Sequence, residues 1–157
     1  MQTHWRLRRA LLKDIEALTR LEAHFPTDRL SRASLRHLIT RGHADVFVIE
    51  SAGVPVSDAV VLYRANSPSA RLYSLVVDPD HRGRGLGDKL MDAAEAAALK
   101  RGRRIMSLEV RPYNYAAQTL YARRGYVNAG WIESFYADGT VALRLQKRLT
   151  QMLTAAA

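Results

Sequence analysis

The chain has 157 residues, 48% of them hydrophobic and 25% charged, which is the composition of one globular domain covering residues 1–157. The absence of cysteine excludes disulfides, thiolate metal sites and cysteine nucleophiles, and the scattered histidines show no metal-ligand spacing, so we expect no metal. No apolar run approaches the roughly 20 residues of a membrane span or forms a signal peptide, which predicts a cytoplasmic protein without a membrane partner.

The net charge of +9 is compatible with an anionic partner, either a phosphorylated cofactor or, as the less favoured case, nucleic acid. In chain order, residues 4–9 alternate as a short strand, and residues 11–25 form an amphipathic helix that Pro26 ends. Ser31 is a good N-cap for a second helix, which stops at Gly42. Three strands follow, at residues 44–51, 56–65 and 70–79.

The second half of the chain alternates helices and strands. An alanine-rich helix over residues 87–102 presents Leu86, Leu90, Ala94 and Ala97 on one face, and the strand at 103–110 turns Met106, Leu108 and Val110 one way. A helix at 114–124 precedes strands at 126–136 and 140–149, which Asp138-Gly139 joins as a hairpin. The order β-α-α-β-β-β-α-β-α-β-β predicts a mixed α/β domain.

Glycines and arginines gather in "VDPDHRGRGLGDKL", residues 77–90, directly after a predicted strand and before a predicted helix. A strand, a glycine loop and a helix N-terminus in this order are what a phosphate cradle requires. A plain tight turn uses the same glycines, and an RNA-binding Arg-Gly tract uses the same arginines, although such tracts are longer and lie outside folded elements.

Two sequence blocks resemble the GNAT N-acetyltransferase superfamily. Arg82-Gly83-Arg84-Gly85-Leu86-Gly87 fits its R/Q-x-x-G-x-G/A signature, and "LEVRPYNYAAQTLYARRGY", residues 108–126, is similar to a second block of the family, in particular of its ribosomal-protein alanine N-acetyltransferase branch. The resemblance runs from about residue 5 to residue 148 and is firmest over residues 70–127. It implies the GNAT fold, a mostly antiparallel twisted sheet of about seven strands flanked by four helices.

The resemblance also implies acetyl-CoA as the acetyl donor. The backbone of Leu75, Val76 and Val77 would pair with the pantetheine arm, and the loop and helix start would hold the pyrophosphate through Arg82, Gly83, Arg84, Gly85, Leu86, Gly87 and Asp88. Asn114 would bind the cofactor near the thioester, although an asparagine at this position is also a good helix N-cap.

Acetyl transfer to an amine needs a group that takes a proton and a group that gives one. The resemblance places the catalytic glutamate at Glu109; the other interpretation is a surface carboxylate neutralised by an arginine such as Arg111. Tyr121 corresponds to the family's acid beside the cofactor sulfur, and its other interpretation is a core aromatic. A backbone N–H at Val77 would polarise the carbonyl. Without cysteine, direct attack in a ternary complex is expected.

The acceptor is the open part of the prediction. The alanine acetyltransferases carry Phe-Pro-Trp where this chain has Phe25-Pro26-Thr27, and an aspartate in the last strand where it has Val141. We expect a primary amine, favouring a protein or peptide N-terminus, with lysine or small amines as alternatives. A non-enzymatic acyl-CoA-sensing or RNA-binding module is the rival class. The oligomeric state is expected to be a monomer or homodimer.

Overall fold

The computed structural model describes residues 4–150, in which seven strands form one open sheet in the order β1-β2-β3-β4-β5-β7-β6. Strands β4 and β5 are parallel, and the other neighbours are antiparallel. The strands are β1 Trp5–Arg9, β2 Ala44–Ser51, β3 Val54–Tyr63, β4 Ser69–Val77, β5 Ile105–Val110, β6 Val127–Ile132 and β7 Ala142–Arg148. The predicted mixed, mostly antiparallel fold is confirmed.

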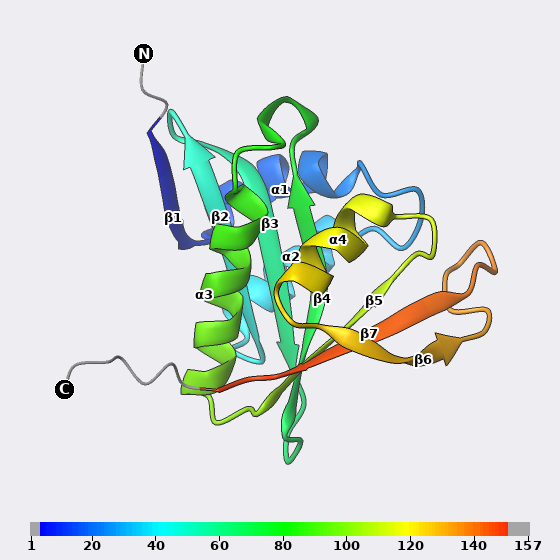
Figure 1. The fold of residues 1–157 in the computed structure, drawn as a ribbon. Coiled ribbons are helices and arrows are strands. Elements are labelled where there is room, and N and C mark those ends of the chain that lie inside the picture. The colour runs from blue at the N-terminus through cyan, green and yellow to red at the C-terminus, as the bar shows by residue number, and fades with distance from the viewer. Residues whose placement is uncertain (1–3, 151–157) are drawn as a thin grey trace.

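Four α-helices lie within the described residues: α1 Ile15–Glu22, α2 Arg32–Thr40, α3 Leu86–Lys100 and α4 Tyr115–Arg123. Short 3-10 turns, η1 Leu12–Asp14 and η2 Pro79–His81, precede α1 and α3. Figure 1 shows α3 and α4 in front of the sheet and α1 and α2 behind it. Between residues 4 and 150, no helix has both the length and the apolar character needed to cross a bilayer.

Each face of the sheet has its own core, because successive strand residues point to opposite faces. The face under α3 and α4 buries Met106, Leu108 and Val110 of β5, as the alternation predicted. The face under α1 and α2 buries a smaller cluster that includes Leu18, Leu35 and Val60. Ser31 caps α2 through a hydrogen bond from the Ser34 amide at 3.1 Å, also as predicted.

Three predicted details are wrong. Helix α1 ends at Glu22 and not at residue 25, because the amides of His24 and Phe25 bond three residues back and tighten the chain into a 3-10 turn. On α3 Ala94 is buried as predicted, but the next buried alanine is Ala98, whereas Ala97 is half-buried at the edge of the core. Strand β6 ends at Ile132 and not at residue 136, although Asp138-Gly139 does lie in a tight turn, which the Gly139 amide closes on the Tyr136 carbonyl at 2.8 Å.

The central feature of the sheet is the point at which β4 and β5 part. Their parallel pairing runs from Ser69 opposite Ile105 to Leu72 opposite Leu108. At the next residue the register of β4 with β3 shifts, since Val61 pairs with Leu72 and Val60 with Ser74, which leaves Tyr73 as an extra residue. A β-bulge of this kind bends the strand that carries it. Beyond the bulge β4 diverges from β5, as Figure 1 shows, and α4 lies across the gap.

Two carboxyl groups are buried side by side behind β4. Glu22 is 2% exposed and Asp58 is fully buried, and the Ser74 hydroxyl donates to Glu22 Oε2 at 3.2 Å. Glu22 Oε1 and both oxygens of Asp58 have no hydrogen-bond partner in the described structure. Burial raises the pKa of Glu22 to about 7. Burial, together with the nearby Glu22 charge, raises the pKa of Asp58 well above its usual value.

This pair should make folding stability depend on pH. The pKa of Glu22 rises from 4.5 to about 7 on folding, so its protonated form favours the folded state and that stability is lost as pH rises from about 4.5 to 7. The loss from Glu22 amounts to about 3 kcal/mol. Glu22→Gln should flatten this decline and unfold at higher temperature than wild type at pH 8, in thermal unfolding measured from pH 4 to 8.

Glu133→Gln is the control, because Glu133 is exposed and the same change there should leave the pH profile unaltered. Identical pH profiles for Glu22→Gln and wild type would show that folding does not raise the pKa of Glu22.

Candidate active site

The edge of β4 beyond the bulge is open on one side. Leu75, Val76 and Val77 pair with β3, opposite Ala59, Asp58 and Ser57 respectively. Their other edge faces the gap, because the described pairing with β5 stops at Leu72. Backbone N–H and C=O groups on such an edge require partners and can pair with an extended ligand. The three residues predicted to hold pantetheine therefore lie on an available strand edge.

The glycine loop connects this edge to the start of α3. Gly83 and Gly85 adopt left-handed backbone conformations, with φ of 75° and 79°, which glycine adopts without steric cost. The Arg82 side chain folds back and its Nε donates to the Val77 carbonyl at 3.2 Å, closing the loop on the strand end. Within residues 4–150, the backbone amides of residues 83–88 donate to no other group. Free amides at a helix N-terminus are suited to bind an anion, so residues 83–88 are the candidate anion site.

The absence of side chains at the glycines also determines how closely other groups can approach the loop. A Cβ added at Gly83 or Gly85 would meet no atom within 4 Å, so these positions border open space. A Cβ at Gly87 would lie 3.3 Å from the Leu120 side chain of α4, so this glycine allows the two helices to approach. The Asp88 carboxylate binds Arg123 at 2.7 Å and Arg124 at 3.2 Å. Helix α4 is thereby fastened to the first turn of α3.

Cations flank the anion site on the side of β1. The Arg84 guanidinium lies 5.9 Å from the centre of the Trp5 ring, and the Lys89 ammonium lies 5.5 Å from it. Cation–π contacts of this kind hold both charges near the helix start without neutralising them. Sequence reasoning did not include Trp5 or Lys89 among the site residues. A basic residue one turn into a helix that follows a glycine loop is the signal that could have suggested Lys89.

Tyr121 lies on the buried face of α4, with 6% of the residue exposed. Its ring meets Tyr126 edge to face, with centroids 5.6 Å apart. Burial and the neighbouring Tyr136 raise the pKa of the Tyr121 phenol above its ordinary value of 10, so the hydroxyl keeps its proton at neutral pH. The core packing and the predicted acid role are compatible in this position.

Glu109 points to the opposite face of β5 from Met106 and Leu108, as predicted, but it is not a surface carboxylate. Its side chain is 5% exposed and lies between two arginines, with Arg71 Nε at 3.1 Å and Arg144 Nη2 at 3.0 Å. The other interpretation gave Arg111 as an example of the neutralising arginine. Arg111 does not contact Glu109, because its guanidinium binds groups in two loops, and Arg71 and Arg144 pair with Glu109 instead.

Arg111 is a site residue that sequence reasoning missed. It is 8% exposed, and its guanidinium donates to Thr27 Oγ1 at 2.6 Å and to Asp138 Oδ2 at 2.9 Å. It also lies 3.9 Å from the centre of the Tyr136 ring. Arg111 thus joins the α1–α2 loop to the β6–β7 loop across the end of β5. Thr27 accepts the hydrogen bond at the position where the family has tryptophan.

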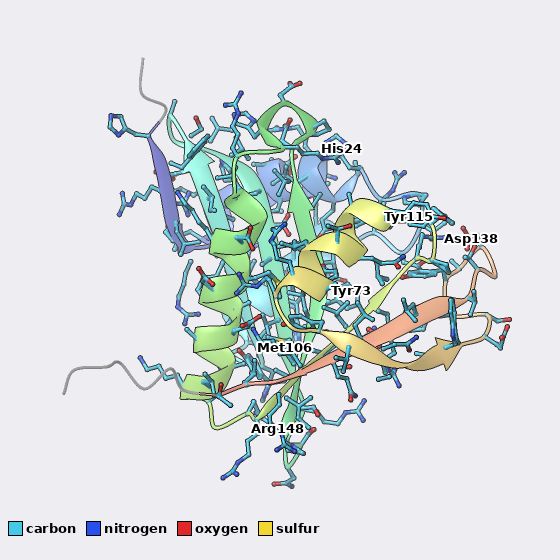
Figure 2. The ribbon with its side chains drawn as sticks, viewed as in Figure 1. His24, Tyr73, Met106, Tyr115, Asp138 and Arg148 are labelled. Atoms are coloured by element: carbon cyan, nitrogen blue, oxygen red, sulfur yellow. The ribbon has the colours of Figure 1, made fainter. Side chains whose placement is uncertain are left out.

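Aromatic side chains lie around Arg71 where the two strands part. Its guanidinium is 5.4 Å from the Tyr73 ring centre and 5.8 Å from that of Phe135 in the β6–β7 loop. Figure 2 labels Tyr73 beside the parting of β4 and β5 and Asp138 on the β6–β7 loop. Tyr73 was hidden from sequence reasoning, because the bulge that exposes it leaves no pattern in a run of strand-forming residues.

Asn114 is the N-cap of α4, since its Oδ1 accepts a hydrogen bond from the Ala117 amide at 3.2 Å. This confirms the capping interpretation, and a contact with the cofactor stays a prediction. Within residues 4–150, no group of three or more histidine, aspartate or glutamate side chains is placed to hold a metal ion.

Comparison with known proteins agrees with this geometry. The family model of the acetyltransferase (GNAT) domain matches residues 12–149. A Bacillus subtilis protein, named as a candidate ribosomal protein bS18-alanine N-acetyltransferase, is 29% identical over 139 residues, or 88% of this chain and 91% of its own length.

Two solved structures share the fold. The structure of Ard1 from Thermoplasma volcanium superposes with a TM-score of 0.85 at 25% identity, over 94% of this chain and 99% of the other. The ribosomal-protein-S18-alanine N-acetyltransferase from Escherichia coli has a TM-score of 0.81 at 22% identity, over 98% and 99% of the two chains. The chain therefore belongs to the GNAT acetyltransferase family, an enzyme family of N-acetyltransferases.

Proposed function

We propose that this protein transfers the acetyl group of acetyl-CoA to the primary amine of a protein or peptide N-terminus, by direct attack within a ternary complex. The observation that carries the proposal is the continuity of the open β4 edge at Leu75–Val77 with the free amides of residues 83–88. An extended arm ending in a pyrophosphate matches this arrangement, since one part needs strand-like pairing and the other an anion site.

The donor class is supported independently by the structural neighbours. A Salmonella typhimurium acetyltransferase with the same fold, at a TM-score of 0.81, was solved with its cofactor acetyl-CoA. The acceptor class is supported by the Bacillus subtilis and Escherichia coli proteins, whose names specify the alanine of a ribosomal protein. The altered Thr27 and Val141 lie on the acceptor side, so the particular protein substrate is left open.

When bound, acetyl-CoA supplies a thioester whose carbonyl carbon an amine can attack, with loss of the thiol. The Val77 N–H, on the open edge, would polarise that carbonyl. The Tyr121 phenol would give its proton to the departing sulfur, a role that fits its raised pKa and its burial. The acceptor amine would release its proton to a carboxylate on the far side of the gap.

We assign that proton to Glu109, which Arg71 and Arg144 hold in a fixed position on the acceptor face. Glu22 is the rival carboxyl. Its pKa of about 7 suits a base at neutral pH, and it lies behind Ser74, next to the exposed Tyr73. Glu22 is 2% exposed, however, whereas a proton acceptor must reach the amine directly or through water. Glu109 is nearly buried as well, with a 5% exposed side chain, but it lies beside Arg71, which contacts Tyr73 at the gap, and this position favours Glu109.

The acceptor class is tested with three amines and a common donor. One peptide has a free α-amine and no lysine, one has a blocked N-terminus and an internal lysine, and the third acceptor is a polyamine. We expect thiol release from acetyl-CoA and an acetyl mass shift on the first peptide. If only the lysine peptide or only the polyamine is acetylated, the acceptor is not a protein N-terminus, and the proposed acceptor class is wrong. Binding of acetyl-CoA without thiol release for any acceptor would instead indicate a sensing module.

The cofactor site is tested by Gly85→Asp. The new carboxylate would enter the open space beside the free amides and repel the pyrophosphate, so thermal stabilisation by acetyl-CoA should be abolished. Gly42→Asp is the matched control, because Gly42 has a φ of 77°, also borders open space and lies before β2 at the other end of the sheet. It should retain full stabilisation. If acetyl-CoA stabilises Gly85→Asp as much as wild type, the pyrophosphate does not bind at this loop.

The proton acceptor is tested by the pH dependence of kcat/KM from pH 6 to 10. Glu109→Gln should lose most activity at pH 7 and recover toward pH of about 8 to 9, where solvent deprotonates an α-amine; a lysine acceptor would recover only above about 10. Glu22→Gln should follow the wild-type curve. The reverse outcome, with a wild-type curve for Glu109→Gln and a loss for Glu22→Gln, would transfer the role to Glu22.

The cytoplasmic location and the expectation of a monomer or homodimer stay predictions. Nucleic-acid binding, the alternative that the basic charge prompted, also stays a prediction.

A further inference from the structure

A groove with two chemically different walls runs along the back of β4, away from α3 and α4. Its first part, about 450 Å³, lies between α2 and β4 and is lined mainly by apolar side chains, among them Leu30, Leu38, Leu62 and Tyr73. Its second part, about 360 Å³, continues over β4, β5 and β7 and is lined by Arg64, Arg71, Arg144 and Gln146. Leu62 lines both parts, and each falls within the usual size of a ligand site.

Strand register explains why the polar side chains share this face. Arg71 of β4 lies opposite Ser107 of β5, and Ser107 lies opposite Gln146 of β7. Glu109, two residues beyond Ser107, lies opposite Arg144. Because strand residues two apart point the same way, these side chains form one polar strip, while Met106 and Leu108 face α3 and α4.

The groove begins at the transfer site. Tyr73, the bulge residue, lines its apolar part, and Arg71 lines its polar part while contacting Tyr73 and Phe135. From Tyr73 back to Ser69 the strand spans about four residues, or roughly 13 Å of extended chain. A polypeptide whose N-terminal amine lies at the gap would therefore place its next few residues along this floor.

The charge of the groove is positive. Its lining includes three guanidinium groups, those of Arg64, Arg71 and Arg144, and the neighbouring carboxylate is Glu109, whose side chain is 5% exposed. Glu109 accepts from one nitrogen of Arg71 and one of Arg144. The other guanidinium N–H groups of these arginines, and those of Arg64, have no acceptor within residues 4–150. Arg144 Nε is buried, and the accessible N–H groups could donate to carboxylates of a bound chain.

We propose that this groove binds the acceptor polypeptide beyond its acetylated residue and selects acidic side chains within about the second to fifth positions. The proposal rests on the proposed acetylation of a protein N-terminus and names the class of chain that is acetylated. The apolar wall of α2 suits the side chains of a peptide, whereas phosphates of a polynucleotide lying along it would face no cation of this wall. Glu109 then has a second role, holding Arg71 and Arg144 side by side.

The test compares three peptides that share length and first residue and carry glutamate, glutamine or lysine at positions 2 to 5. Initial rates of thiol release from acetyl-CoA give kcat and KM for each peptide. We expect kcat/KM to fall roughly tenfold or more from the glutamate to the lysine peptide, mainly through KM, and the difference to shrink at 0.5 M salt.

Arg64→Glu reverses one charge in the groove away from Glu109 and should remove most of the preference for the glutamate peptide. Arg6→Glu is the matched control, because Arg6 is exposed on β1 at the opposite edge of the sheet. It carries the same change of charge and should keep the preference. An equal loss in both variants would show an effect of net charge and overturn the groove assignment.

Equal kcat/KM for all three peptides would overturn this inference and leave N-terminal acetylation intact. No transfer to any peptide would overturn both. A short single-stranded RNA that competes with the glutamate peptide, and whose binding Arg64→Glu weakens but Arg6→Glu does not, would assign the groove to nucleic acid instead.

Discussion

The parting of β4 from β5 is the constraint on which the site depends, because it leaves one strand edge without a partner in the middle of the sheet. The bulge at Tyr73 bends β4 away after Leu72, so the backbone of Leu75–Val77 faces a gap. Helix α4 covers the gap on one face (Figure 1), while the α1–α2 and β6–β7 loops meet at Arg111 on the other. Donor and acceptor would therefore approach from opposite faces.

The charged groups on the two faces of the gap differ in kind. On the donor face, free amides of residues 83–88 are flanked by Arg84 and Lys89. On the acceptor face, a nearly buried carboxylate, Glu109, holds two arginines that would otherwise repel each other. The carboxyl pair of Glu22 and Asp58 differs from both, because no cation of residues 4–150 pairs with it and burial favours its protonated form. The carboxyl groups therefore differ in their neighbours: Glu109 is paired with arginines, whereas burial favours the protonated forms of Glu22 and Asp58.

Local pattern predicted most of the fold, because β4 and β5 alternate, β2 and β3 are apolar runs of strand length, and helices begin or end at Ser31, Gly42 and Asn114. The glycine spacing likewise predicted the loop before α3. What the sequence could not predict was pairing over long range. The bulge at Tyr73, the contact of Arg111 with Thr27 and the two arginines on Glu109 all join residues far apart in the chain, and local patterns carry no information about such partners.

The most direct measurement of the central claim is amide hydrogen exchange with and without acetyl-CoA, read by NMR at single residues. Binding should slow exchange of the amides of residues 83–88 and of those amides in Leu75–Val77 that face the gap, because none of these groups has a partner among residues 4–150. The amides of β2, which are already paired on both sides, should change little. Unchanged exchange at both segments, with protection elsewhere, would contradict the account.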